Sequence, residues 1–204
     1  MSTTDEAPAA VAVGTGIADP APLGLAAFAL TTFLLSAVNA GWAKNSSGSD
    51  WLGYALAYGG LCQLLAGMWE FRNRNVFGAT AFSTYGGFWI GVGLWAILVA
   101  PHAPAGSKDL GWILLAFAIF NTYMLIFSSQ LNVAVFGVFL TLELTEIFLF
   151  IGTFANSSGM VKAGGVIGII TAFVAWYASA AGVINGMKGK QVLPVGSPLF
   201  NLGA

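Results

Sequence analysis

Charged side chains are scarce in this sequence of 204 residues, which has 7 basic residues, 8 acidic residues and a net charge of −1. They make up 7% of the chain, whereas an average soluble domain has about 25%. So few charges cannot cover a globular surface with groups that water solvates. The chain also lacks the clustered lysine and arginine on which nucleic-acid recognition depends, so no nucleic-acid partner is expected.

Cysteine and histidine are nearly absent, with Cys62 and His102 the single examples. One cysteine allows no intrachain disulfide, and no nearby Cys or His completes a zinc-type ligand set. The motifs G-x-x-x-x-G-K-[ST], H-E-x-x-H and G-x-S-x-G, which mark common enzyme sites, are missing too. We therefore expect no metal, no cofactor and no enzymatic activity.

Long apolar runs dominate the sequence, which is 57% hydrophobic with a mean hydropathy of +0.82. A transmembrane helix needs about 20 predominantly apolar residues, and the runs are continuous, unlike the alternating pattern of outer-membrane strands. The sequence thus predicts an all-α integral membrane protein with six transmembrane helices per protomer. The predicted spans are 23–42, 51–69, 82–100, 110–127, 133–154 and 164–187.

Short tails flank the predicted membrane domain of residues 21–188: a mobile N-terminal tail, 1–20, and a C-terminal tail, 189–204. Six crossings place both termini on the same side. The excess of basic residues near that side predicts a multi-pass protein of the cell membrane with cytoplasmic termini. Arg72, Arg74, Lys188 and Lys190 lie on the terminus side, and Lys44, Lys108 and Lys162 on the other.

Glycines at a spacing of four occur in two of the predicted spans. Gly87 and Gly91 form one such step, and Gly164 and Gly168 another. This spacing exposes backbone on one helix face and lets two helices pack closely in lipid. Helix packing is one interpretation, and a narrow pore wall in the third span is the other.

Several predicted spans contain polar side chains, whose transfer from water into the membrane costs free energy, so a structural or functional role is expected for them. Thr32 and Ser36 place hydroxyls on one face of the first span, and Gln63 and Asn121 lie in later spans. Hydroxyls can also bond the backbone of their own helix, which is the structural alternative. Polar groups in several spans fit a path for a small polar solute better than a passive anchor.

Two glutamates, Glu143 and Glu146, lie within the fifth apolar run. A central acidic side chain costs roughly 2.5 to 3.5 kcal/mol on insertion scales, and two on one helix face repel each other when both are ionised. One of them is therefore expected to hold a proton, either as a proton-binding site or as part of a hydrogen-bonded structural pair. Glu70, beside Arg72 and Arg74, is expected to form an ion pair.

Three blocks of sequence carry specific motifs in a fixed order. Residues 19–28 read DPAPLGLAAF, residues 75–89 read NVFGATAFSTYGGFW and residues 192–196 read VLPVG. They resemble N-P-A-P-L-G-L-x-x-F, N-T-F-G-x-T-A-F-x-S-Y-G-x-F-W and V-L-P-I-G of the acetate uptake transporters, which include bacterial succinate-acetate permeases and fungal acetate and ammonium exporters. The resemblance implies a homo-hexamer in membrane lipid whose six-helix protomers each carry a path for small monocarboxylates.

The same resemblance implies a hydrophobic constriction formed by Phe28, Tyr85 and Leu142. Asp19 stands where the family has asparagine. The helix start behind Pro20 and Pro22 has free N–H groups and a positive dipole end, which favour an anion. The predicted substrate-binding residues are Pro22, Leu23, Gly24, Leu25, Thr31, Thr32 and Tyr85, and the proton-coupling candidates are Glu146, which shares a face with Leu142, and Glu143.

These features predict a transporter or anion channel for acetate and related short monocarboxylates, with proton symport and with succinate as a further substrate. Two alternatives stay open at this stage. One is an exporter of ammonia or ammonium, and the other is a membrane scaffold that transports nothing. Channel and carrier mechanisms are equally compatible with the sequence.

Overall fold

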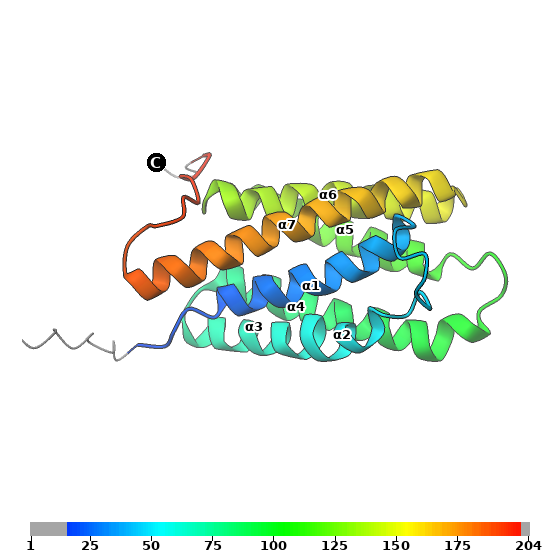
Figure 1. The fold of residues 1–204 in the computed structure, drawn as a ribbon, viewed down its shortest axis with the longest axis horizontal. Helices are drawn as coiled ribbons and strands as arrows, with labels where there is room; N and C mark the ends of the chain where they lie inside the picture. Colours follow the sequence, from blue (N-terminus) through cyan, green and yellow to red (C-terminus); the bar gives the residue numbers. More distant parts are fainter. Residues whose placement is uncertain (1–15, 201–204) are drawn as a thin grey trace, which may run out of the picture.

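The computed structural model describes residues 16–200, and helices are the only regular secondary structure within them (Figure 1). The first 15 residues, most of the predicted N-terminal tail, and residues 201–204 lie outside this description. Five helical stretches of the described part are long and apolar enough to cross a membrane. They are α1 (Ala21–Asn39), α4 (Val76–Leu94) with its continuation to His102, α5 (Asp109–Ser128), α6 (Val133–Phe154) and α7 (Ser158–Lys188).

The sixth crossing consists of three segments that follow one another without a break. They are α2 (Leu52–Leu56), the π-helix η1 (Ala57–Cys62) and α3 (Gln63–Arg72). Together they cover residues 52–72, a length that can span a membrane, although this stretch is not among the five that are both long and apolar enough. The predicted all-α fold with six transmembrane crossings is confirmed.

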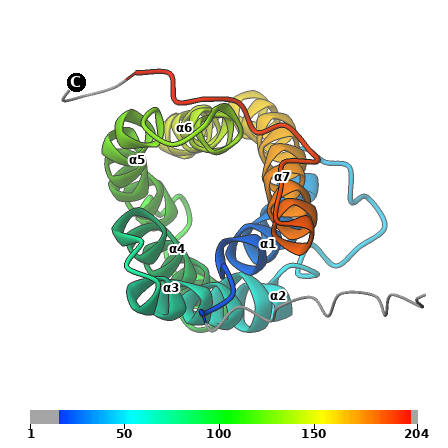
Figure 2. The ribbon, with the colours of Figure 1, turned by 90° about the vertical axis from the view of Figure 1, so that its left-hand side faces the viewer.

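Viewed along the bundle axis, the crossings form a closed ring in the order α1, α2–α3, α4, α5, α6 and α7 (Figure 2). The pairs α1–α7, α6–α7, α5–α6 and α3–α4 pack closely. The first helix starts, and the last helix ends, at the same end of the bundle (Figure 1). We call this the terminus end and the opposite one the far end.

Two helices begin six residues before the predicted spans. The first is α4, which starts at Val76, because Asn75 Oδ1 accepts a hydrogen bond from the Gly78 N–H at 3.1 Å. The second is α7, which starts after Ser157, whose Oγ accepts from the Met160 N–H at 3.4 Å. Such caps satisfy N–H groups that a first helical turn leaves free, and hydropathy does not detect them.

Glycines let α7 approach α1 at backbone distance. Gly165 lies against the backbone of Asn39 and Ala40, and Gly168 lies against the Ser36 side chain. A Cβ on either residue would overlap these neighbours, so the packing interpretation of Gly168 holds. Gly87 has no neighbour within 4 Å of a Cβ in the described part of the chain.

The C-terminal segment folds back over the terminus end of the bundle. Gly189, with φ +60°, ends α7 in the left-handed conformation that glycine adopts without strain. Asn185 then holds the returning chain with both ends of its amide. Its Oδ1 accepts from the N–H groups of Val192 at 2.7 Å and Leu193 at 2.9 Å, and its Nδ2 donates to the Leu193 carbonyl at 2.9 Å.

Two further contacts fix the same segment to the ring. The Tyr177 hydroxyl donates to the Pro194 carbonyl at 2.6 Å, and the Ala134 N–H donates to the Val195 carbonyl at 2.9 Å. The second contact satisfies an N–H group in the first turn of α6. We call residues 190–200 the strap, because they connect the end of α7 to the start of α6 (Figure 2).

Replacement of Asn185 with Ala should release the strap. Three hydrogen bonds disappear, and a net loss of about 1 to 2 kcal/mol is expected, equivalent to roughly 2 to 8 °C in melting temperature. Thermal unfolding in detergent and the rate of trypsin cleavage after Lys190 measure the effect. Asn185→Asp keeps the acceptor for both N–H groups and should lose less. A cleavage rate equal to the parent's in Asn185→Ala would contradict this role.

Candidate functional site

Four cavities follow one another along the axis of the ring. From the terminus end, their volumes are about 220, 20, 40 and 80 Å³. We call them the mouth, inner, central and far cavities. Neighbouring cavities share lining residues, so together they mark one line through the bundle. The mouth and inner cavities share Leu25, the inner and central cavities share Phe28, Tyr85 and Leu142, and the central and far cavities share Leu35, Asn39, Phe88, Leu114 and Leu149.

Phe28, Tyr85 and Leu142 lie at the boundary between the inner and central cavities. They come from α1, α4 and α6, and each is at most 6% exposed. The rings of Phe28 and Tyr85 meet edge to face, with centroids 5.8 Å apart and an interplanar angle of 65°. The structure therefore brings together the three residues that the sequence predicted as a constriction, and two aromatic rings and a leucine separate the cavities.

The Tyr85 hydroxyl is engaged within the protein. It donates to Asn121 Oδ1 at 2.9 Å, and Asn121 Nδ2 donates to the Phe139 carbonyl at 3.0 Å and to Glu143 Oε2 at 2.7 Å. Asn121 is fully buried. This arrangement differs from the expectation that Tyr85 donates to a substrate, because its hydroxyl hydrogen is already directed at an amide oxygen.

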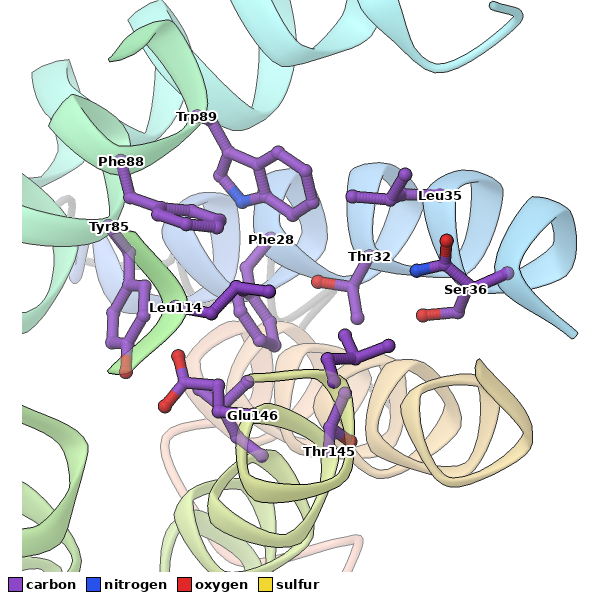
Figure 3. Close-up of a pocket in the computed structure, with 13 residues that line it drawn as sticks. Phe28, Thr32, Leu35, Ser36, Tyr85, Phe88, Trp89, Leu114, Thr145 and Glu146 are labelled. Atoms are coloured by element: carbon purple, nitrogen blue, oxygen red, sulfur yellow. The ribbon is translucent and has the colours of Figure 1, made fainter. Parts of the chain in front are cut away.

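The two glutamates of α6 face different surroundings. Glu143 turns to α5, where its Oε1 accepts from the Thr122 hydroxyl at 2.9 Å and its Oε2 accepts from Asn121. Glu146 is buried and lines the central cavity, with its carboxyl beside the Tyr85 hydroxyl (Figure 3). Its Oε2 has no hydrogen-bond partner within residues 16–200. The hydrogen bonds of Glu143 fit the structural interpretation, whereas Glu146 Oε2 is buried beside the central cavity without a partner among the described residues.

Three of the residues that line the central cavity each have a buried polar atom without a hydrogen-bond partner in the described part of the chain. These atoms are Thr32 Oγ1, Trp89 Nε1 and Glu146 Oε2. Sequence reasoning missed Trp89. The available signal was its place in the block 75–89, one helical turn after Tyr85 and therefore on the same face. The rest of the lining is mainly apolar (Figure 3).

Thr31 lies away from the cavities, contrary to the expectation for a substrate-binding residue. Its hydroxyl donates to the Ala27 carbonyl at 3.1 Å, and its side chain packs against Gly59 of η1. Adjacent helical residues point about 100° apart. Because Thr32 faces the central cavity, Thr31 has to face the neighbouring helix.

The N-terminus of α1 is already capped by an acidic side chain. Asp19 Oδ1 accepts a hydrogen bond from the Ala21 N–H at 2.9 Å. A carboxylate of the chain thus occupies part of the site where the sequence predicted an external anion. Asp19 also lines the mouth cavity, so it adds negative charge there.

The other predicted residues at the start of α1 divide between the mouth cavity and its surroundings. Pro22 and Leu25 line that cavity. Gly24 packs against the Phe82 ring, which leaves no room for a Cβ. Leu23 is 45% exposed and borders a separate open groove between α1 and α7. Only Pro22 and Leu25 of this group therefore border the line of cavities.

The ion pair expected for Glu70 does not form within the described residues. Glu70 is fully buried, its Oε2 accepts from Asn73 Nδ2 at 3.3 Å, and its carboxyl packs against Gly78. The turn after α3, in which Arg74 has φ +60°, leaves both Arg72 and Arg74 exposed. The Asn73 side-chain amide therefore bonds the Glu70 carboxylate in place of the predicted arginine.

Comparison with known proteins identifies the chain's relatives. Residues 3–197 match the model of the GPR1/FUN34/yaaH family. Acetate permease A of Emericella nidulans is 40% identical over 195 residues, which cover 87% of this chain and 65% of that protein. The succinate-acetate/proton symporter SatP of Escherichia coli is 36% identical over 189 residues, 89% of this chain and 97% of that protein.

Another fungal relative is named for the transport of ammonia instead of acetate. Ammonia transport outward protein 2 of Saccharomyces cerevisiae is 39% identical over 173 residues, which cover 81% of this chain and 61% of that protein. The chain spans somewhat less than two thirds of the length of these fungal relatives.

A solved structure has the same fold. The structure of the bacterial acetate channel SatP superposes with a TM-score of 0.82 at 33% sequence identity, covering 89% of this chain and all of that one. The family match over nearly the whole chain, the sequence identities and the shared fold agree: the chain belongs to the GPR1/FUN34/yaaH family.

Proposed function

We propose that this protein is a membrane transporter or channel for acetate and related short monocarboxylates, and that it is not an enzyme. The row of four cavities, divided by Phe28, Tyr85 and Leu142, carries the proposal. Relatives named for acetate transport support it, as does the fold shared with an acetate channel. By the same resemblance we propose a homo-hexamer in the cell membrane with cytoplasmic termini, and succinate as a further substrate.

The apolar boundary between the inner and central cavities favours neutral solutes. A hydrated anion has to shed water there, and Phe28 and Leu142 offer it no hydrogen bonds in return. A carboxylate that travels with a proton avoids most of this cost. The boundary therefore supports the coupled movement of acetate and a proton.

Glu146 is the proposed carrier of that proton. Its carboxyl lines the central cavity directly beside the boundary. Tyr85 of α4 and Glu143 of α6 are the titratable groups near it, and the lining residues from α1 and α5 are uncharged. An ionised Glu146 would repel acetate in the same small cavity, whereas a protonated one can donate a hydrogen bond to it.

The purified protein in proteoliposomes should move radiolabelled acetate down its gradient, because the path offers hydrogen-bond donors and apolar walls. Labelled methylammonium, a cation, should move at the rate of protein-free vesicles. Movement of methylammonium without movement of acetate would support the ammonium exporter. Movement of neither solute would support a membrane scaffold.

Leu142→Ala and Phe28→Ala should each widen the boundary. We expect acetate flux to rise by roughly threefold or more, or larger acids to enter, since a hydrophobic constriction limits passage by excluding water. Flux in proteoliposomes at equal protein content is the measurement. Leu144→Ala is the matched control, because Leu144 lies on the same helix but is 42% exposed on the outside. Parent-like flux and selectivity in both test variants would remove these residues from the path.

Glu146→Gln should keep acetate exchange but lose the response to external acid. In the parent, uptake should rise as external pH falls, because acid both protonates Glu146 and supplies the driving proton. Glutamine imitates the protonated form at every pH. Uptake is measured across pH after subtraction of the flux of protein-free vesicles, which accounts for the acetic acid that crosses lipid unaided.

Glu143→Gln provides the control for the pH experiment. Glu143 accepts hydrogen bonds from α5 and lies outside the cavity lining, so its variant should keep the rise of uptake in acid. Proton carriage by Glu146 would be disproved by a Glu146→Gln profile that overlays the parent's.

A further inference from the structure

We propose that the central cavity is a carboxyl-binding site in which the Trp89 indole N–H and the Thr32 hydroxyl hold the carboxylate of a short monocarboxylate, while Glu146 shares a proton with it. The proposal rests on the proposed function and deepens it. It assigns ligand contacts to Trp89 and Thr32, and it places the bound solute on the far side of the boundary formed by Phe28, Tyr85 and Leu142.

Trp89 provides the strongest observation. It is 3% exposed, and its Nε1 lacks an acceptor within residues 16–200. A buried N–H without an acceptor is rare in native proteins and requires an explanation. In Figure 3 the nitrogen edge of the indole faces Phe88 and Phe28, two residues that line the cavity. A carboxylate oxygen in the cavity would give this N–H its partner.

Thr32 approaches the same space from α1. Several other threonines within spans donate to the carbonyl four residues earlier, as Thr141 does to Gly137 at 2.8 Å and Thr153 does to Leu149 at 2.8 Å. Thr32 is 5% exposed, and its buried hydroxyl has no such bond in the described structure. Its donor capacity is therefore available to a solute.

The third polar group completes the recognition of a carboxylate. Two neutral donors, Trp89 and Thr32, leave the negative charge of the ligand in place. A protonated Glu146 can share its proton with one carboxylate oxygen, and only an O–H bond changes position in that exchange. The pair of carboxyl groups then carries one negative charge in total, whether the proton is on Glu146 or on the ligand.

The remaining wall limits the length of the ligand. The cavity measures about 40 Å³, and Leu35, Leu114 and Leu149 close it toward the far end. A cavity needs about 10 to 15 Å³ to hold one water molecule, so this one accepts a few water molecules or a similarly small solute. Apolar side chains suit a methyl group, which favours acetate over longer acids.

Three variants test the site through the acetate concentration that gives half-maximal flux in proteoliposomes. Trp89→Phe removes the N–H but also shrinks the ring. Replacement of Trp89 by 3-benzothienylalanine keeps the bicyclic shape and places sulfur where the N–H was. Thr32→Val keeps the side-chain shape without the hydroxyl. Each variant should raise the half-saturating concentration about tenfold, which corresponds to about 1.4 kcal/mol.

Trp112→Phe is the matched control, because Trp112 is 64% exposed on α5 and lies outside the cavities. Its half-saturating concentration should stay within twofold of the parent's. Leu114→Ala should raise butyrate flux relative to acetate, since it enlarges the space for the alkyl end of the ligand.

The outcomes separate this site from the proposed function. A parent that moves no acetate overturns both. The site alone is overturned if the parent moves acetate but the benzothienylalanine variant has a half-saturating concentration within twofold of the parent's. In that case the central cavity holds water and does not bind the carboxylate.

Discussion

The buried amide of Asn121 joins α5 to both of its neighbours in the ring, α4 and α6. The α4 and α5 backbones approach each other less closely than those of α3 and α4 or of α5 and α6. Asn121 bridges the gap by accepting from Tyr85 and donating to Glu143 and to the Phe139 carbonyl. Unpaired polar groups are expensive in a bilayer, so each member of this network holds the others in place.

Two consequences for the site follow from this network. The Tyr85 ring is fixed by its hydroxyl and by edge or tilted contacts with Phe117 and Phe120, so it stays at the boundary between the inner and central cavities. Glu143 is drawn to the seam between α5 and α6. Positions three apart on a helix differ by about 60° in direction, so Glu146 turns to the interior. One carboxyl thus supports the ring, and the other faces the central cavity.

In the opposite part of the ring, α1 and α7 are joined by close backbone packing and by a hydrogen bond that the Ser179 hydroxyl donates to the Pro22 carbonyl at 2.7 Å. Gly165 and Gly168 of α7 let α1 pack at backbone distance. The spacing of Gly164 and Gly168 predicted close packing, but Gly164 lies against Leu149 of α6, whereas Gly168 lies against Ser36 of α1. Sequence reasoning did not reveal which helix the glycines would contact, because spacing describes one helix face and carries no information about the partner. The same reasoning missed Trp89, since an unpaired N–H is visible only when its neighbours are known.

The sequence by itself determined the all-α class, the six crossings, the scarcity of groups for metal or nucleic-acid chemistry, and the family to which the three motif blocks point. Composition and hydropathy act locally along the chain, so they suffice for these conclusions. Only the tertiary structure decided which polar groups face a cavity and which face a neighbouring helix. Thr31 and Thr32, and likewise Glu143 and Glu146, are similar in sequence terms, yet their surroundings differ because each helix is rotated by its contacts with two neighbours in a closed ring.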